Sequence, residues 1–163
     1  MEFITLNLQD KNMMDALLPL YQAYEAEISE EEIEDIFPPE EFEENYKYFE
    51  SYFYGCITYI PVINGEFKGF VSFHVDTEDM RGYAEGYDGW GHMAEIYTIK
   101  EVRGSGLGKI MAKMAEEELK KLGVKGIYLT DISGKGGFWE SVGYKDSGKI
   151  EPNEGGKIYE KHI

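Results

Sequence analysis

The chain has 163 residues, enough for one domain with a single core, and we expect one domain over residues 1–163. Its 32 acidic and 16 basic side chains give a net charge of −16, which argues against partners such as nucleic acid or an anionic membrane and favours cationic ones such as amines. Such a surface could also serve only solubility. With no apolar membrane span, no signal peptide and a lone Cys56, the sequence predicts a cytoplasmic protein without disulfides.

The first half of the chain predicts a strand, two helices and a hairpin. Residues 3–8 alternate between apolar and polar, as a strand does, and Asp10 can cap a helix that Pro19 should bend or interrupt. A second helix should begin near Pro39. Asn64-Gly65, a strong hairpin signal, separates two predicted strands, residues 56–63 and 67–75.

The second half predicts a long loop followed by alternating strands and helices. Residues 77–91 are rich in Gly, Asp and Tyr and predict a loop whose length suggests a functional role. Further strands are predicted at 93–99, 127–130, 144–150 and 157–162, with a long helix ending at Leu122 and a short helical turn at 138–142. This order predicts an α+β fold: a mixed sheet flanked by helices.

A glycine-rich turn joins the predicted strand 93–99 to the long helix. Gly104, Gly106 and Gly108 alternate between Arg103 and Lys109. Glycines let the backbone approach a bulky anion closely, and the free amides of a helix start point at it. Three glycines in one turn are costly in chain entropy, so we interpret the turn as a phosphate cradle and not as a bare connection.

The spacing of this turn excludes two other phosphate-binding motifs. A P-loop requires a glycine separated by four residues from its Gly-Lys-Ser/Thr end, but here Arg103 stands at that position, five residues ahead of Gly108, and Ile110 follows Lys109. A dinucleotide fingerprint requires G-x-G-x-x-G, whereas this turn has G-x-G-x-G.

The turn and a later segment resemble the GNAT superfamily of N-acetyltransferases. Arg103, Gly106 and Gly108 match the family's Q/R-x-x-G-x-G/A signature, and residues 137–144, GFWESVGY, are similar to its F-Y-E-K-x-G-F segment. The resemblance covers essentially the whole chain, and is firmest from about residue 56 onward. It implies a largely antiparallel sheet, with acetyl-CoA as co-substrate in a splay between two parallel strands.

The resemblance also implies how the cofactor is held. Backbone groups of the strand would pair with the pantetheine arm, and amides of the turn would hold the pyrophosphate. The implied cofactor-binding residues are Ile96, Tyr97, Thr98, Arg103, Gly104, Ser105, Gly106, Leu107, Gly108, Lys109 and Trp139. An amine would attack the thioester directly in a ternary complex.

Several residues are candidates for the proton transfers. Glu95 lies beside apolar residues, where burial would raise its pKa and make it a usable base; Asp131 ends the opposite strand, and His92 ranks ahead of His74. Each also has a structural interpretation: a surface carboxylate, a turn or helix cap, or a structural histidine. Neither a catalytic triad nor a metal-ligand cluster is indicated by spacing.

Trp139 stands where many family members carry a tyrosine that protonates the departing thiolate. An indole cannot act as an acid, so the thiolate would leave unaided, or Ser133 or Tyr144 would replace the tyrosine, or catalysis has been lost.

The leading hypothesis is therefore an amine acetyltransferase, and the alternative is a non-catalytic acyl-CoA-binding or sensing module. The acceptor would be a small-molecule or peptide amine, and a cationic one is favoured by the carboxylates of residues 25–50 and 76–88. The family often forms homodimers, but the sequence leaves the oligomeric state open.

Overall fold

The computed structural model describes residues 1–132, 134 and 136–163. Its helices and strands follow one another along the chain as β1 (Glu2–Thr5), α1 (Lys11–Ser29), α2 (Ile33–Ile36), η1 (Pro39–Glu41), α3 (Phe42–Phe53), β2 (Ile57–Ile63), β3 (Glu66–Phe67), β4 (Gly69–Val75), β5 (Gly91–Thr98), η2 (Lys100–Val102), α4 (Leu107–Lys121), β6 (Gly126–Asp131), α5 (Gly136–Ser141), β7 (Lys145–Ile150) and β8 (Lys157–His162).

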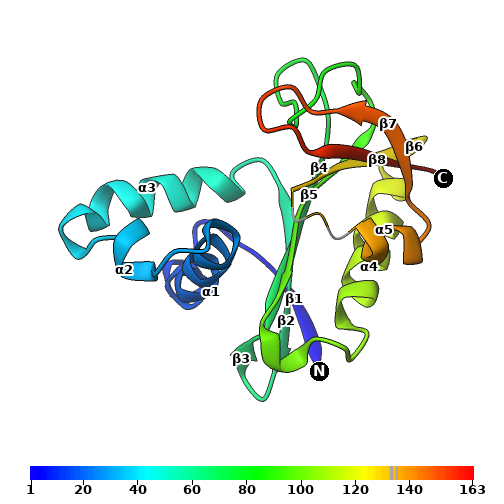
Figure 1. The fold of residues 1–163 in the computed structure, drawn as a ribbon. Helices are drawn as coiled ribbons and strands as arrows, with labels where there is room; N and C mark the ends of the chain where they lie inside the picture. Colours follow the sequence, from blue (N-terminus) through cyan, green and yellow to red (C-terminus); the bar gives the residue numbers. More distant parts are fainter. Residues whose placement is uncertain (133, 135) are drawn as a thin grey trace.

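A single mixed sheet organises the described chain. Its strands lie in the order β1-β2-β4-β5-β6-β8-β7, with β3 paired to β2, and every pair is antiparallel except β5 with β6. Helices α1 to α3 lie on one side of the sheet, and α4 and α5 lie on the other (Figure 1). This arrangement confirms the predicted α+β fold with flanking helices.

Each side of the sheet has its own apolar core. On the α1 side the core is mostly aromatic, and Tyr21, Phe49 and Phe53 are fully buried in it. On the α4 side, Met111 and Leu119 of the amphipathic helix pack against strands β4 to β6. No helix in the described part of the chain is long and apolar enough to cross a membrane.

The predicted helix cap and hairpin turn are present in the structure, but the predicted break at Pro19 is not. Asp10 caps α1 by accepting a hydrogen bond from the amide of Met13. Asn64 and Gly65 both have positive φ, as the predicted tight hairpin requires. Pro19 was expected to bend or interrupt its helix, yet α1 continues through it from Lys11 to Ser29.

Strands β5 and β6 separate soon after they begin to pair. Their ladder is confined to Gly91 with Ile127 and His92 with Tyr128. On its other edge, β5 pairs with β4 along its length, but the register shifts so that Phe73 faces Met93 and Ser72 faces Glu95. A β-bulge of this kind bends a strand and re-aims its side chains. The second half of β5 therefore leaves β6 and opens a gap between the two strands.

Candidate functional site

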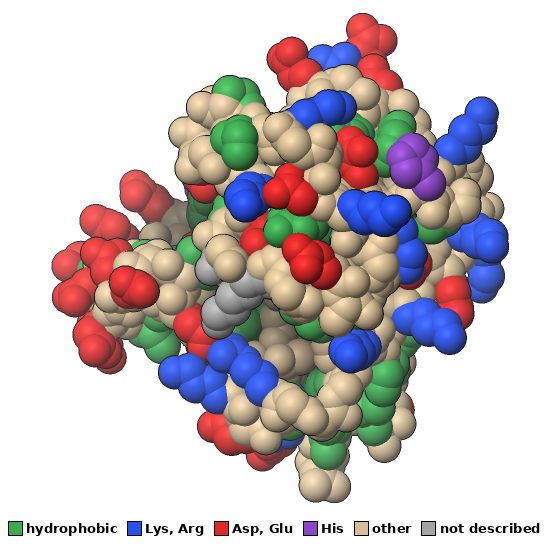
Figure 2. All heavy atoms as spheres, turned by 45° about the vertical axis from the view of Figure 1, so that its right-hand side comes forward, with side chains coloured by type: hydrophobic (Ala, Val, Ile, Leu, Met, Phe, Trp, Pro, Cys, Tyr) green, Lys and Arg blue, Asp and Glu red, His purple; other side chains and the backbone are tan. Residues whose placement is uncertain are grey.

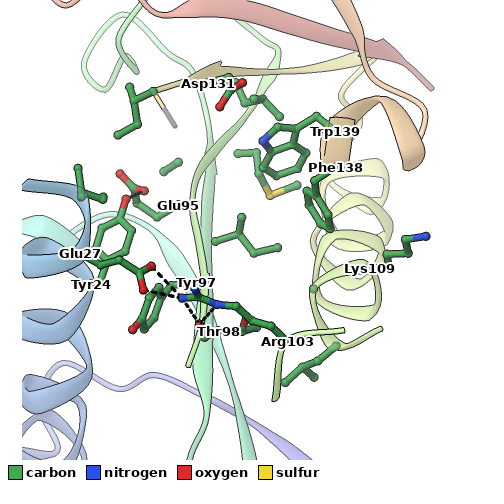
Figure 3. Close-up of a pocket in the computed structure, with 18 of the residues that line it drawn as sticks. Tyr24, Glu27, Glu95, Tyr97, Thr98, Arg103, Lys109, Asp131, Phe138 and Trp139 are labelled. Atoms are coloured by element: carbon green, nitrogen blue, oxygen red, sulfur yellow. Dashed lines mark hydrogen bonds and ion pairs between the residues drawn. The ribbon is translucent and has the colours of Figure 1, made fainter. Parts of the chain in front are cut away.

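The gap between β5 and β6 holds a cavity of about 620 Å³, within the range of ligand pockets. Helix α1, the start of α4 and α5 complete its walls (Figure 3). The lining residues are Tyr24, Glu27, Ile28, Met93, Ala94, Glu95, Ile96, Tyr97, Thr98, Val102, Arg103, Gly104, Gly106, Leu107, Gly108, Lys109, Leu129, Thr130, Asp131, Ile132, Phe138 and Trp139. The structure thus brings together all the predicted cofactor-binding residues except Ser105, whose hydroxyl donates to the carbonyl of Val102.

The glycine-rich turn closes one end of the cavity. Gly104 and Gly106 have φ of 83° and 88°, which side chains rarely adopt, and a Cβ on either would meet no atom within 4 Å. Gly108 is small for another reason, because a Cβ there would lie 3.3 Å from the ring of Phe138. The first helical bond of α4 runs from Ile110 N to Gly106 O, so the three preceding amides have no partner within the helix. This end of the cavity is therefore open to a ligand and lined by peptide N–H groups.

The side chains of Arg103 and Lys109, the two basic residues of the turn, point away from its free amides (Figure 3). The guanidinium of Arg103 donates to Glu27 of α1 at 2.8 Å and to the carbonyl of Thr98 at 2.8 Å, and lies over the ring of Tyr97 (Figure 3). Lys109 is exposed and extends away from the cavity. Both residues were predicted to bind the cofactor and both line the cavity, but the side chain of Arg103 ties α1 to the end of β5.

Glu95 occupies the face of β5 that looks toward α1. The hydroxyl of Tyr24 donates a hydrogen bond to its Oε2 (Figure 3). Burial, with a smaller contribution from Glu154, raises the pKa of Glu95 to about 8. A carboxyl group with this pKa can exchange protons near neutral pH, as a general base must. Tyr24 was missed from the sequence as a site residue, because it reads as one more aromatic residue of the apolar face of a helix.

Across the cavity, β6 contributes Thr130 and Asp131. Asp131 is 8% exposed, ends β6 as the sequence predicted, and lines the cavity. The hydroxyl of Thr130 is buried without a hydrogen-bond partner among the described residues, so it is a polar group of the wall that sequence reasoning overlooked. Ser133, a candidate acid, lies outside the described residues.

The other candidate acid, Tyr144, is a core residue. It is 1% exposed, packs against Trp139 with ring centroids 5.3 Å apart, and does not line the cavity. Its buried hydroxyl has no hydrogen-bond partner in the described structure. This placement fits packing beneath the cavity wall better than proton transfer within it, whereas Trp139 itself lines the cavity.

His92 does not line the cavity either. It is 2% exposed, stacks on Tyr128, and burial lowers its pKa to about 3, so it is not a base at neutral pH. It meets His74 and Asp76 in a buried group. The sequence indicated no metal-ligand cluster, because these residues are separated by the long loop.

Exposed acidic residues gather on the segment that follows α1. Figure 2 shows carboxylates gathered at the end of the molecule that carries α2. The exposed ones in this segment are Glu30, Glu31, Glu32, Glu34, Asp35, Glu40, Glu41, Glu43 and Glu44. The loop of residues 77–90 is less available than expected: Asp76 is buried, Asp88 pairs with Arg81, and Tyr87 stacks on Tyr128.

Solved structures share this fold, although a comparison with curated protein sequences gave no match. The PaiA N-acetyltransferase of Thermoplasma acidophilum, solved with coenzyme A, is 16% identical with a TM-score of 0.65, each chain covering 100% of the other. An aminoglycoside 6'-acetyltransferase type Ii is 17% identical with a TM-score of 0.67, over 99% of this chain and 97% of that one. The ribosomal-protein-alanine N-acetyltransferase of Brucella melitensis is 16% identical with a TM-score of 0.64, over 100% of both chains.

The sequence itself decides the family. Residues 19–144 match the profile of the acetyltransferase (GNAT) family. This match spans α1 from Pro19 onward, the splayed strands, the glycine-rich turn and the segment around Trp139, which are the parts that build the cavity. The chain therefore belongs to the acetyltransferase (GNAT) family.

Proposed function

We propose that this protein is an N-acetyltransferase that moves the acetyl group of acetyl-CoA to an amine. The observation that carries the proposal is the cavity that runs between β5 and β6 and ends on the open first turn of α4. Such a turn offers backbone donors to a pyrophosphate. Family membership and the coenzyme A bound to the PaiA enzyme support the same ligand.

Different walls of the cavity would bind different parts of acetyl-CoA. The amides at Leu107, Gly108 and Lys109 would hold the pyrophosphate, and the unpaired edge of β5 from Ile96 to Thr98 would bond the pantetheine arm. Trp139 and Phe138 supply apolar surface between them. Residues from Arg103 to Gly106 would bring the backbone close to the phosphates, and there Arg103 acts by holding the turn and not by contacting the ligand.

The chemistry needs one base and one oriented nucleophile. In the proposed reaction the amine nitrogen bonds to the carbonyl carbon of the thioester, the C–S bond breaks, and coenzyme A leaves as a thiolate. Glu95 takes the proton that the amine loses, directly or through a water, and Tyr24 orients its carboxylate. Asp131, on the opposite wall, is the alternative base. A thiolate with an ordinary pKa of about 8.5 can leave without an acid.

We infer that the acceptor is a cationic amine. The mouth of the cavity adjoins a second hollow that shares Ile28, Asp131 and Ile132 with it and adds Glu154. Carboxylates at such an entrance raise the local concentration of cations. Lys157 also borders this second hollow, so the charge there is mixed. The net charge of −16 attracts cationic amines to the protein as a whole.

A thiol-release screen tests the proposal. The protein is incubated with acetyl-CoA and with amines grouped as polycationic, neutral and zwitterionic, and free coenzyme A thiol is measured over many turnovers. We expect steady release with the cationic group. Tight binding of acetyl-CoA without release by any amine would instead support the non-catalytic binding module. Faster turnover of zwitterionic amines would contradict the cationic acceptor while leaving the acetyltransferase in place.

A further inference from the structure

A buried polar group lies at the opposite end of β5 from the glycine-rich turn. His74 and His92 face each other across the β4–β5 ladder, and Asp76 follows directly after β4. Their exposed fractions are 7%, 2% and 1%. One ligand atom from each, a ring nitrogen or a carboxylate oxygen, lies within 4.8 Å of the other two.

Three of the four ring nitrogens in this group lack a hydrogen-bond partner among the described residues. Both nitrogens of His92, and Nε2 of His74, have no hydrogen-bond partner among the described residues. Nε2 of His74 also lies 2.9 Å from Oδ1 of Asp76, an ion-pair contact, so the nitrogens of His92 are the ones left without any such contact. A buried polar atom without a partner costs free energy, so such atoms usually bind a water or an ion.

We propose that His74, Asp76 and His92 bind a divalent transition-metal ion such as Zn²⁺, which fastens the loop of residues 77–90 to the sheet. Two imidazoles and one carboxylate are the donor set of many zinc sites, and three protein ligands leave one position for a water. Zinc ligands lie about 2.0–2.2 Å from the ion, so the ligand atoms, which now lie within 4.8 Å of one another, would shift to complete the site. The proposal does not depend on the acetyltransferase function.

Neighbouring residues already hold the proposed ligands in place. Asp76 accepts a hydrogen bond from Tyr128 Oη at 2.5 Å and one from Gly82 N at 3.1 Å. Sγ of Cys56 lies 3.8 Å from Nδ1 of His74. A proton on that Nδ1 directs the lone pair of Nε2 toward the ion.

A metal at this position would close the loop at its base. The amide of Asp76 donates to Trp90 O, and the amide of Gly89 donates back to Asp76 O. The loop also passes directly over the ligands, because a Cβ added to Gly82 would lie 2.5 Å from Nδ1 of His92. The ion would therefore join the end of β4 to the start of β5, and Asp76 would pass this link to the loop through its hydrogen bond from Gly82 N.

The test uses the full chain without an affinity tag, freed of metal by dialysis against a chelator. Co²⁺ is added as a spectroscopic probe, and Zn²⁺ is added in a thermal-unfolding series. We expect visible absorption bands that saturate at one equivalent of Co²⁺, and a melting temperature raised by about 5–10 °C when Zn²⁺ exceeds its Kd about 100-fold. Zn²⁺ should also slow trypsin cleavage after Arg81, an exposed loop residue, as followed by mass spectrometry.

The chain supplies a matched control, since it has three histidines and His162 is exposed and outside the group. His92→Asn should abolish all three effects, and His162→Asn should keep them. If His92→Asn does not fold, Asp76→Asn, which keeps the shape of the side chain, replaces it. The proposal is overturned if wild-type protein shows no Co²⁺ bands, if His92→Asn or its substitute binds like wild type, or if only His162→Asn loses binding.

Discussion

The fold buries the carboxyl group of Glu95, and this burial favours its protonated form. Its pKa rises to about 8 because it is buried between β5 and α1, and Glu154 adds negative charge. The hydrogen bond from Tyr24 orients the carboxylate, and the pKa of Glu95 stays raised despite it. Both its proposed role and its effect on stability follow from this one shift.

The first prediction concerns the pH dependence of activity. As the proposed base, Glu95 must be ionised, so kcat/KM should rise with pH through about 8. Glu95→Gln should lower kcat by ~100-fold or more and remove this limb of the profile, with the Kd of acetyl-CoA nearly unchanged. If the limb survives and Asp131→Asn removes it instead, Asp131 is the base.

The second prediction uses the same variant as a stability probe. The pKa of Glu95 is higher in the folded than in the unfolded state, so the folded protein binds the proton more tightly and loses stability as pH rises from about 4.5 to about 8. Glu95→Gln carries no ionisable group there. Its melting temperature relative to wild type should therefore increase between pH 5 and pH 8.5. A difference that stays constant with pH would show that the carboxyl titrates normally.

The third prediction compares two glycines of similar conformation. Gly106 and Gly148 have φ of 88° and 81°, and an added Cβ meets nothing within 4 Å at either, but only Gly106 lines the cavity. Valine should strain the backbone similarly at both. Gly106→Val should abolish the rise in melting temperature produced by acetyl-CoA, and Gly148→Val should retain it. Equal shifts in both variants would exclude the turn as the phosphate site.

The fourth prediction concerns Tyr144. Because its hydroxyl is buried without a described partner, Tyr144→Phe should leave kcat unchanged and keep or raise the melting temperature. Steady-state kinetics and thermal unfolding measure both. A ~100-fold loss of kcat, the lower end for removal of a general acid, would restore Tyr144 as the acid.

At the scale of elements, the site depends on how α1 is attached to β5. Arg103 is the link, since it contacts Glu27 of α1 and the last carbonyl of β5 together. The splay of β5 from β6 provides the space, and α1 and the glycine-rich turn close it. The position of α1 also sets the distance between Tyr24 and Glu95.

A double-mutant cycle tests this attachment. Glu27 and Arg103 are about a third exposed, so solvent weakens their pairing, and we expect a coupling of about 0.5–1 kcal/mol in urea unfolding of Glu27→Gln and Arg103→Gln. The more exposed pair Lys11–Asp15 is the control, and its coupling should be smaller because solvent screens it more strongly. A coupling no larger than that of the control would remove Arg103 as a structural link.

At the scale of the whole molecule, the excess of carboxylates is the dominant electrostatic feature. The net charge of −16 is spread over the surface, with a concentration on the segment around α2 (Figure 2). Raising ionic strength from ~0.01 M to ~0.15 M shortens the Debye length from about 30 to about 8 Å. The KM of a polycationic amine should therefore rise several-fold, and that of a zwitterionic amine should change little. An equal response of both amines would show that the charge serves only solubility.

The sequence by itself determined what is encoded locally. The glycines at 104, 106 and 108, the cap at Asp10, the Asn64-Gly65 turn and the alternation of apolar residues all act on their own neighbours, so a reader of the chain can recognise them. Because the glycine-rich turn and the segment around Trp139 are short and contiguous, they also pointed to the family.

The tertiary structure decided which distant side chains meet. Tyr24 and Glu95 are 71 residues apart, and Arg103 and Glu27 are 76 apart, so no periodicity links them. The bulge in β5 and the packing of α1 on the sheet bring each pair together. The same holds for His74, Asp76 and His92, which come together only because β4 and β5 pair across a long loop. Contacts of this kind depend on where whole elements pack, and that is settled by the burial of both cores and not by any local pattern.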